Sequence, residues 1–208
     1  MSTLVLLTGL MGSGKSTVAQ MIKDKGYKVI DTDSLMKTLY DDPSIKQYVH
    51  VLFGDRAFED WPARNSDDVR DRKVDLKYIK DVFFDKRFML ASDALEAALY
   101  QSFRSHFRLY DDTDDIIFVE AAPVRYIDCF IRDYKIKNFV NVICSEFKRK
   151  NNLYNRSGMN VDDVVRRDMR QHPFRAKDCY TIENDMGLEE LKTAVNNCLK
   201  QIKEDLHE

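Results

Sequence analysis

The feature that most constrains this chain is a motif near its start, Gly9-Leu10-Met11-Gly12-Ser13-Gly14-Lys15-Ser16. It matches the pattern Gly-x-x-x-x-Gly-Lys-Ser/Thr, in which glycines let the backbone bend around a phosphate group and turn N–H groups toward it. Residues 3–8 form a short apolar run typical of a buried parallel strand, and Val18, Met21 and Ile22 recur at helical spacing. A strand, a glycine loop and a helix in this order predict a site for a nucleoside triphosphate.

The residue types in the motif have separate chemical tasks. Lys15 is predicted to reach the β- and γ-phosphates, and Ser16 is predicted to hold Mg²⁺ through its hydroxyl. The following helix would point the positive end of its dipole at the phosphates. The alternative is a glycine-rich turn that carries a surface lysine. The residues predicted to bind the nucleoside triphosphate are Gly9, Met11, Gly12, Ser13, Gly14, Lys15, Ser16 and Thr17.

Short apolar runs alternate with helical patterns along the rest of the chain, which is typical of a parallel sheet covered by helices. The further strands are expected at residues 27–30, 116–119, 139–144 and 180–182, and a closing amphipathic helix is expected at 188–206. Between these, apolar residues recur at spacings of three and four among charged ones, as in a helical insertion. We therefore predict a three-layer α/β fold of the P-loop NTPase class. Its core comprises residues 1–42 and 109–208, and a helical substrate-binding insertion covers residues 43–108.

Charge and cysteine content narrow the classes of partner. The 33 Lys and Arg residues nearly balance the 35 Asp and Glu residues, so no overall positive field attracts nucleic acid or an anionic membrane. The four cysteines are widely spaced, which argues against a disulfide framework or a zinc site. The apolar run at residues 4–7 is too short for a signal or membrane segment. We expect a cytoplasmic protein that acts on a small molecule.

Three carboxylates follow predicted strands, where open parallel sheets place their ligands. Asp33 is the candidate to orient or deprotonate an acceptor hydroxyl, and Asp31 is the weaker candidate. The alternative for Asp33 is that it caps the next helix. Glu120 ends the strand at residues 116–119, where it would either hold a Mg²⁺-bound water or be a surface charge.

A basic stretch lies between residues 147 and 175. Its members are Lys148, Arg149, Lys150, Arg156, Arg166, Arg167, Arg170 and Arg175. Arginines can hold a transferring phosphoryl group by two-point contacts, and the segment around Ser157-Gly158 could close over a site. These features predict a small lid over about residues 147–171. The alternative is a solvated helix face on which neighbouring aspartates pair with the cations.

These motifs resemble those of the dephospho-coenzyme A kinase family. The resemblance is tight over the first 33 residues, from Leu7-Thr8-Gly9 through the phosphate loop to Asp31-Thr32-Asp33. It continues in patches at Leu52-Phe53-Gly54, Val82-Phe83, Arg156 through Arg167 to Gln171, and Ile182-Glu183-Asn184 with Gly187. The resemblance implies transfer of the ATP γ-phosphate to the ribose 3′-hydroxyl of dephospho-coenzyme A, the final step of coenzyme A biosynthesis.

The resemblance also implies roles for individual residues. Asp33 and Arg156 would join Lys15 as catalytic residues, and Arg156 and Asn184 would contact the nucleotide. Residues assigned to acceptor binding are Asp33, Glu120, Pro123 and Arg125.

Departures from the family pattern leave the acceptor open. Tyr100-Gln101 stands where the family usually has His-Pro, and Pro123-Val124-Arg125-Tyr126-Ile127 replaces a Pro-Leu-Leu segment and a nearby acid. A nucleoside or deoxynucleoside monophosphate kinase is the alternative, because Glu120 with Arg125 could serve a nucleotide acceptor. A non-catalytic nucleotide-binding relative is a lesser alternative. A GTP-binding switch would usually need Asn-Lys-x-Asp and Asp-x-x-Gly, and neither string occurs.

Overall fold

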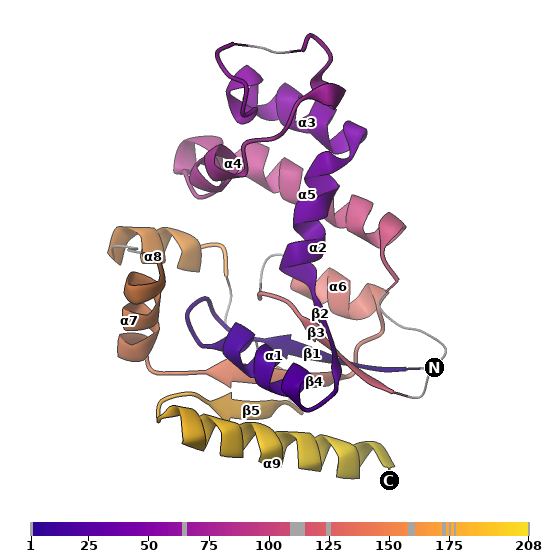
Figure 1. Ribbon diagram of the computed structural model, residues 1–208, viewed down its shortest axis with the longest axis vertical. Coiled ribbons are helices and arrows are strands. Elements are labelled where there is room, and N and C mark those ends of the chain that lie inside the picture. The colour runs from indigo at the N-terminus through magenta and orange to yellow at the C-terminus, as the bar shows by residue number, and fades with distance from the viewer. Residues whose placement is uncertain are drawn as a thin grey trace. The chain divides into compact units, whose positions relative to one another are not determined.

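The computed structural model (Figure 1) describes residues 2–63, 66–108, 115–123, 126–157, 161–171, 174, 176 and 178–207, without the side chains of residues 156, 157, 161 and 207. The chain forms two compact units. One consists of Met1–Thr32 with Leu109–Glu208, and the other of Asp33–Arg108.

The first unit is built around a parallel sheet with the strand order β2-β3-β1-β4-β5. The strands are β1 (Thr3–Thr8), β2 (Lys28–Asp31), β3 (Ile116–Glu120), β4 (Asn138–Ile143) and β5 (Tyr180–Glu183). The central β1 is buried from Leu4 onward, because a parallel strand covered on both faces carries apolar side chains in both directions. The predicted α/β class is confirmed, and each expected strand is present with bounds that differ by at most one residue.

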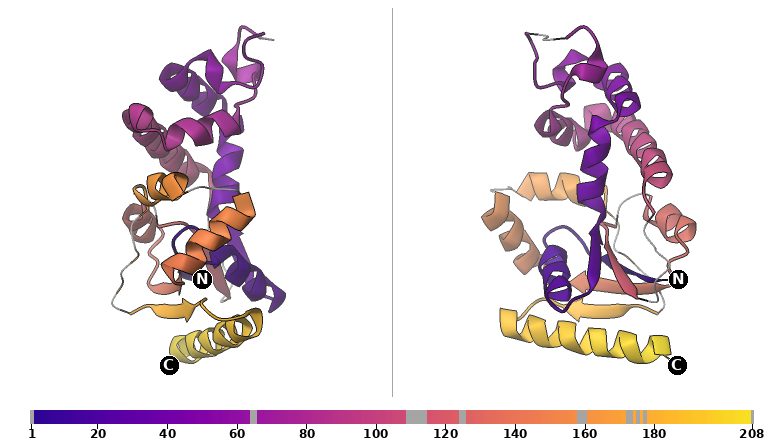
Figure 2. Two further views of the ribbon diagram at one scale, coloured as in Figure 1. Left: turned by 90° about the vertical axis from the view of Figure 1, so that its left-hand side faces the viewer. Right: turned by 45° about the vertical axis from the view of Figure 1, so that its right-hand side comes forward.

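Helices α1 (Lys15–Asp24) and α9 (Leu188–His207) pack on one face of this sheet, and Figure 2 shows α9 running along β5. Their inward residues form a core with strand residues; the helical members are Val18, Ala19, Ile22, Leu191, Val195, Cys198, Leu199 and Ile202. The other helices are α6 (Ile127–Asp133), α7 (Glu146–Ser157) and α8 (Val161–Asp168). In the part of the chain that the structure describes, no helix has both the length and the apolarity to cross a membrane.

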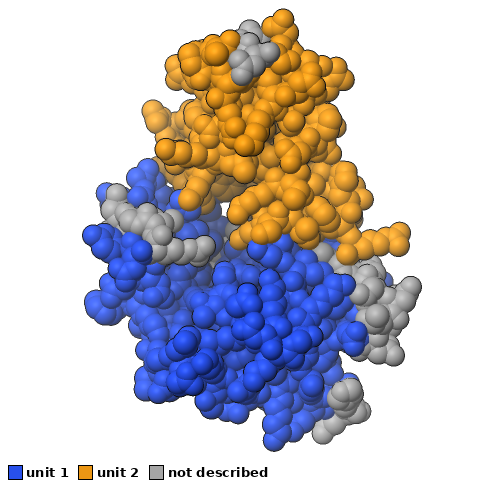
Figure 3. All heavy atoms as spheres, viewed as in Figure 1, with its two compact units in different colours: residues 1–32, 109–208 blue, residues 33–108 orange. Residues whose placement is uncertain are grey.

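The second unit (orange in Figure 3) consists of helices joined by turns. Its helices are α2 (Thr32–Thr38), α3 (Pro43–Phe53), α4 (Leu76–Phe83) and α5 (Met89–His106). The first residue of α2, Thr32, still belongs to the first unit. Short 3-10 turns lie at Leu39–Asp41, Asp55–Ala57, Val69–Asp71 and Lys86–Phe88. Asp42 and Asp75 cap α3 and α4 by accepting hydrogen bonds from backbone N–H groups of the first turn. Apolar residues expected at helical spacing, such as Ile79, Leu95 and Phe103, are buried.

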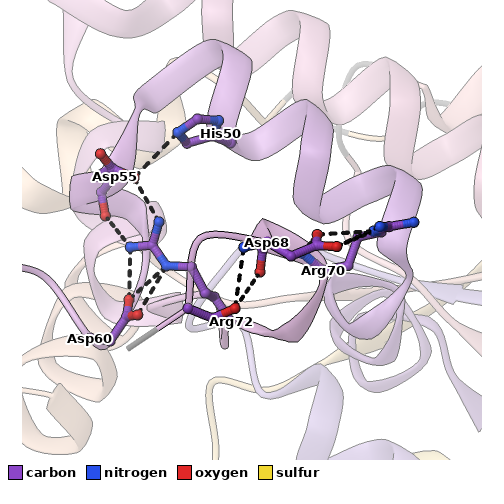
Figure 4. A network of polar contacts seen from close by, with 7 residues as sticks. His50, Asp55, Asp60, Asp68, Arg70 and Arg72 are labelled. Atoms are coloured by element: carbon purple, nitrogen blue, oxygen red, sulfur yellow. Dashed lines mark hydrogen bonds and ion pairs between the residues drawn. The ribbon is translucent and has the colours of Figure 1, made fainter. Parts of the chain in front are cut away.

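A buried arginine stabilises the irregular segment between α3 and α4 (Figure 4). The side chain of Arg72 is 1% exposed, and its Nε donates to both carboxylate oxygens of Asp60 at 2.9 and 3.0 Å. Its Nη1 donates to Oδ1 of Asp55 at 2.6 Å, and its guanidinium lies 4.4 Å from the centre of the Phe58 ring. Although burial lowers the pKa of Arg72, the hydrogen bonds with Asp60 and Asp55 outweigh it and raise that pKa. This arrangement, the Arg72 cluster, compensates a charge that would otherwise be costly to bury.

Candidate active site

The phosphate loop connects β1 to α1, and its three glycines have backbone angles that favour glycine. The φ angles of Gly9, Gly12 and Gly14 are +154°, +86° and +97°. A Cβ atom on Gly12 would lie 2.8 Å from the carbonyl oxygen of Arg149, and one on Gly14 would lie 2.1 Å from Nδ2 of Asn184. The glycines are therefore required for two reasons, the turn itself and the close packing of the loop on its outer side.

Side chains from outside the loop hold its carbonyl groups. Asn152 Nδ2 on α7 donates to the Gly12 carbonyl at 2.9 Å, and Asn184 Nδ2 after β5 donates to the Ser13 carbonyl at 2.8 Å. In a trans peptide the C=O and the following N–H point in opposite directions. The Asn184 contact therefore turns the Gly14 N–H away from Asn184, to the inner side of the loop.

The N-terminus of α1 is suited to an anion. Gly14 is its N-cap, with no side-chain hydrogen bond to the first turn, and no acidic residue lies in that turn. The first N–H groups of a helix have no partners within the helix and carry the positive end of its dipole. The predicted strand, loop and helix thus place an uncapped helix end directly after the phosphate loop.

Lys15, Ser16 and Glu120 meet at this helix end. Lys15 Nζ donates to Glu120 Oε1 at 2.7 Å, and Ser16 Oγ donates to the same oxygen at 2.8 Å. Glu120 is 6% exposed, lies opposite Leu7 in the β1–β3 register, and accepts a hydrogen bond from Thr32 Oγ1 at its carbonyl. Glu120 is therefore no exposed surface charge, which was one of the two expectations for it.

The other two carboxylates occupy different positions. Asp31 ends β2, half-buried and opposite Glu120 in the β2–β3 register. Asp33 is exposed and lies inside the first turn of α2, which begins at Thr32. As the second residue of that helix, Asp33 does not occupy the N-cap position that the alternative interpretation gave it.

The basic stretch is largely paired in the part of the chain that the structure describes. Arg149 forms a two-point contact with Asp168 at 2.8 and 2.5 Å, Lys150 contacts Glu146 at 2.6 Å, and Arg166 contacts Asp163 at 3.0 Å. Lys148 Nζ donates to the Met186 carbonyl at 2.6 Å. These four cations are therefore paired with groups of the protein itself in this structure.

Several predicted residues lie outside the described side chains. Arg125, Gly158 and Arg175 lie outside the described residues, and Arg156 is described only as part of the α7 backbone. Pro123 is buried just after β3. Met11 lies in the loop with its peptide hydrogen-bonded at both ends, and Thr17 lies in the first turn of α1.

Arg149, Asn152 and Gln171 also contact the loop, and the sequence did not predict them as site residues. Arg149 and Asn152 are three positions apart on α7, a spacing that puts them on one helix face. The sequence marks Arg149 only by its charge and Gln171 only as the end of the predicted lid. No local pattern marks either amide as a partner of the loop.

The chain is similar to dephospho-CoA kinases in sequence. A family model described as dephospho-CoA kinase matches residues 3–65. A dephospho-CoA kinase of Lactobacillus acidophilus is 28% identical over 99% of this chain and 100% of its own length. One of Fusobacterium nucleatum is 22% identical over 92% and 94%. The resemblance predicted from the motifs is confirmed.

Solved structures share the fold. A protein named TT1252 from Thermus thermophilus has a TM-score of 0.63 at 22% identity, covering 96% of this chain and 97% of its own. A dephospho-CoA kinase from Campylobacter jejuni has a TM-score of 0.59 at 14% identity, covering 99% of both chains.

Proposed function

We propose that this chain, a phosphotransferase related to dephospho-CoA kinases along its whole length, transfers the γ-phosphoryl group of ATP to the ribose 3′-hydroxyl of dephospho-CoA. The observation that carries the proposal is the meeting of Lys15 Nζ and Ser16 Oγ on one oxygen of Glu120, at an uncapped helix end after a glycine loop. A cation, a hydroxyl and a carboxylate so placed suit a bound triphosphate and its metal ion.

ATP fits the loop through its backbone. The predicted cradle comprises Gly9, Met11, Gly12, Ser13 and Gly14, with Thr17 beside it in the first turn of α1. The N–H groups of Met11, Ser13 and Thr17 donate to Gln171 Oε1, the Leu10 carbonyl and the Gly14 carbonyl. We therefore assign the phosphate contacts to the N–H groups of Gly12 and Gly14 and to the start of α1. The buried hydroxyl of Ser13 has no hydrogen-bond partner among the described residues, so the loop retains an unused polar atom. Lys15 would leave Glu120 for the β- and γ-phosphates and stabilise the charge that develops during transfer.

Mg²⁺ fits the same place, because it prefers hard oxygen ligands and usually keeps several waters. Ser16 Oγ would be its protein ligand, and Glu120 would hold one of its waters. When bound, the metal neutralises charge on the phosphate oxygens.

The acceptor requires residues beyond the loop. Asp33 would orient or deprotonate the 3′-hydroxyl, because a carboxylate can accept its proton as the oxygen attacks phosphorus. Arg156, in the last turn of α7, would contact the transferring phosphoryl group, and Asn184 would lie beside the nucleotide. We assign acceptor binding to Glu120, Pro123 and Arg125, with the insertion at residues 43–108 as the substrate-binding domain and residues 147–171 as a lid.

The acceptor is tested by incubating purified protein with ATP and Mg²⁺ against dephospho-CoA and a panel of nucleoside and deoxynucleoside monophosphates. Product is measured by chromatography. We expect dephospho-CoA to give the highest kcat/KM. If a nucleoside monophosphate were turned over faster, it would replace dephospho-CoA as the proposed acceptor. If no acceptor were phosphorylated, the proposed kinase activity would be refuted.

Asp33 is tested with Asp33→Asn, which removes the carboxylate charge at nearly constant shape. We expect kcat to fall by ~10²-fold while the ATP dissociation constant changes little, because a general base acts on the chemical step. Asp81→Asn, at an exposed position on α4, is the matched control. Unchanged kcat in a folded Asp33→Asn protein would remove Asp33 from the mechanism and leave Asp31 as the candidate.

A further inference from the structure

The peptide groups on both sides of Met11, the third residue of the phosphate loop, are held from outside. The Met11 N–H donates to Gln171 Oε1 at 2.9 Å, and the Met11 carbonyl accepts from Arg149 Nη1 at 3.3 Å. Gln171 follows α8 and Arg149 lies on α7, so both partners come from the segment that contains the basic stretch. Arg149 and Gln171 are only 7% and 8% exposed.

These contacts close into a ring through Asp168. Arg149 donates to both carboxylate oxygens of Asp168, at 2.8 and 2.5 Å, and the Gln171 N–H donates to the Asp168 carbonyl at 3.1 Å. Met11, Gln171, Asp168 and Arg149, here called the Met11 ring, are thus linked in a closed path. Buried polar groups are costly to leave unpaired, so removing one member of the ring would leave its neighbours without hydrogen-bond partners.

The ring determines which way the loop's peptide groups point. Since Arg149 holds the Met11 carbonyl, the Gly12 N–H of the same peptide points away from α7. Since Gln171 holds the Met11 N–H, the Leu10 carbonyl points the opposite way, where it accepts from the Ser13 N–H at 3.0 Å. Two side chains outside the loop therefore orient consecutive peptides inside it.

We propose that Gln171 and Arg149 are positioning residues that set the phosphate loop through the Met11 peptides and couple it to the α7–α8 segment. The charge of Arg149 serves this contact, and its pKa is raised by its hydrogen bond with Asp168. This proposal rests on one part of the proposed function, the binding of ATP by the loop. It does not depend on the identity of the acceptor.

The test compares Gln171→Ala, which removes the acceptor, with Gln171→Glu, which keeps an oxygen at the same reach. Gln201→Ala, at an exposed position on α9, is the control. Amide hydrogen exchange at Met11 is followed in protein labelled with ¹⁵N-methionine, and ATP binding is measured by calorimetry. We expect exchange at Met11 to be about 10-fold faster in Gln171→Ala and ATP affinity to fall by about 5-fold, the loss of one modest hydrogen bond. Gln171→Glu should restore slow exchange.

The outcomes separate cleanly. Equal exchange at Met11 in Gln171→Ala and in the unmodified protein would overturn the ring. Faster exchange with unchanged ATP affinity would overturn the positioning role and leave a purely structural contact. If the unmodified protein does not bind ATP at all, the proposed function fails, and the Met11 exchange rates still decide whether the ring exists.

Discussion

The Arg72 cluster and the Lys15–Glu120 pair are both ion pairs with little exposure to solvent, yet they are built differently. The side chain of Arg72 is 1% exposed, and its planar guanidinium contacts two carboxylates, a backbone carbonyl and the Phe58 ring. The Lys15 and Glu120 side chains are 11% and 8% exposed, and they meet at a single oxygen that Ser16 shares.

The difference lies in how easily each cation could change partners. The five N–H donors of a guanidinium form a rigid fork, and here that fork is engaged on several sides at once. An ammonium is a compact point charge on a flexible stem, so it can exchange one oxygen for another at small cost. Similar burial therefore accompanies a structural contact in one unit and, in the function proposed above, a ligand-binding role in the other.

The largest effect is expected on catalysis, when Lys15, the cation that can change partners, is removed. Lys15→Ala should lower kcat by ~10³-fold or more, because a fixed cation no longer stabilises the charge that develops on the phosphates. The protein should remain folded, as measured by circular dichroism. Lys23→Ala, an exposed lysine on the same helix, should leave kcat unchanged. Near-normal turnover in folded Lys15→Ala would refute the kinase mechanism.

The next largest effect is expected on stability, when Arg72, whose guanidinium is engaged on several sides, is removed. Arg72→Met should lower the free energy of unfolding by about 3–5 kcal/mol, because it leaves two carboxylates without their buried cation. Arg70→Met is the matched control, since Arg70 and Asp68 form an exposed pair beside the cluster (Figure 4) and should not shift the denaturant midpoint. If Arg72→Met were as stable as Arg70→Met, the cluster would not stabilise this unit.

The smallest of these effects sharpens the role of Glu120. Glu120→Gln removes the negative charge but keeps an oxygen that can accept from Ser16, and we expect the Mg²⁺ concentration for half-maximal rate to rise by ~10- to 100-fold. Excess Mg²⁺ should recover part of the lost rate. An unchanged Mg²⁺ dependence would show that Glu120 only pairs with Lys15 and does not support the metal.

Features encoded in consecutive residues could be predicted from the sequence. The apolar run of β1, the glycines after it and the helical spacing of α1 lie within residues 3–24, so their order is visible in the sequence. The same holds for β3, whose apolar run ends at Glu120. Helix α6, between β3 and β4, was not among the predicted elements, although Ile127, Phe130, Ile131 and Tyr134 recur at helical spacing. At seven residues it gives a periodic pattern of only two turns.

Features that depend on tertiary contact could not be predicted. The outer supports of the phosphate loop join residues 138 to 171 positions apart, such as Arg149 with Met11 and Asn184 with Ser13. Nothing in the spacing of those residues reveals the partner. The basic stretch was similarly ambiguous, because an arginine that pairs with Asp168 and one that awaits a phosphate have the same local sequence.

The separation of the phosphate loop from its supports has a consequence for how the site is made during protein synthesis. The loop is synthesised before the residues that contact it, since Glu120, Asn152, Gln171 and Asn184 follow at least 104 positions later. At ~5–20 residues per second, the loop waits about 5 to 20 s for Glu120 and longer for Asn184. Bound ATP therefore cannot stabilise the growing chain through this complete site until Asn184 has been made, and a chain truncated before Asn184 would lack part of the loop's support.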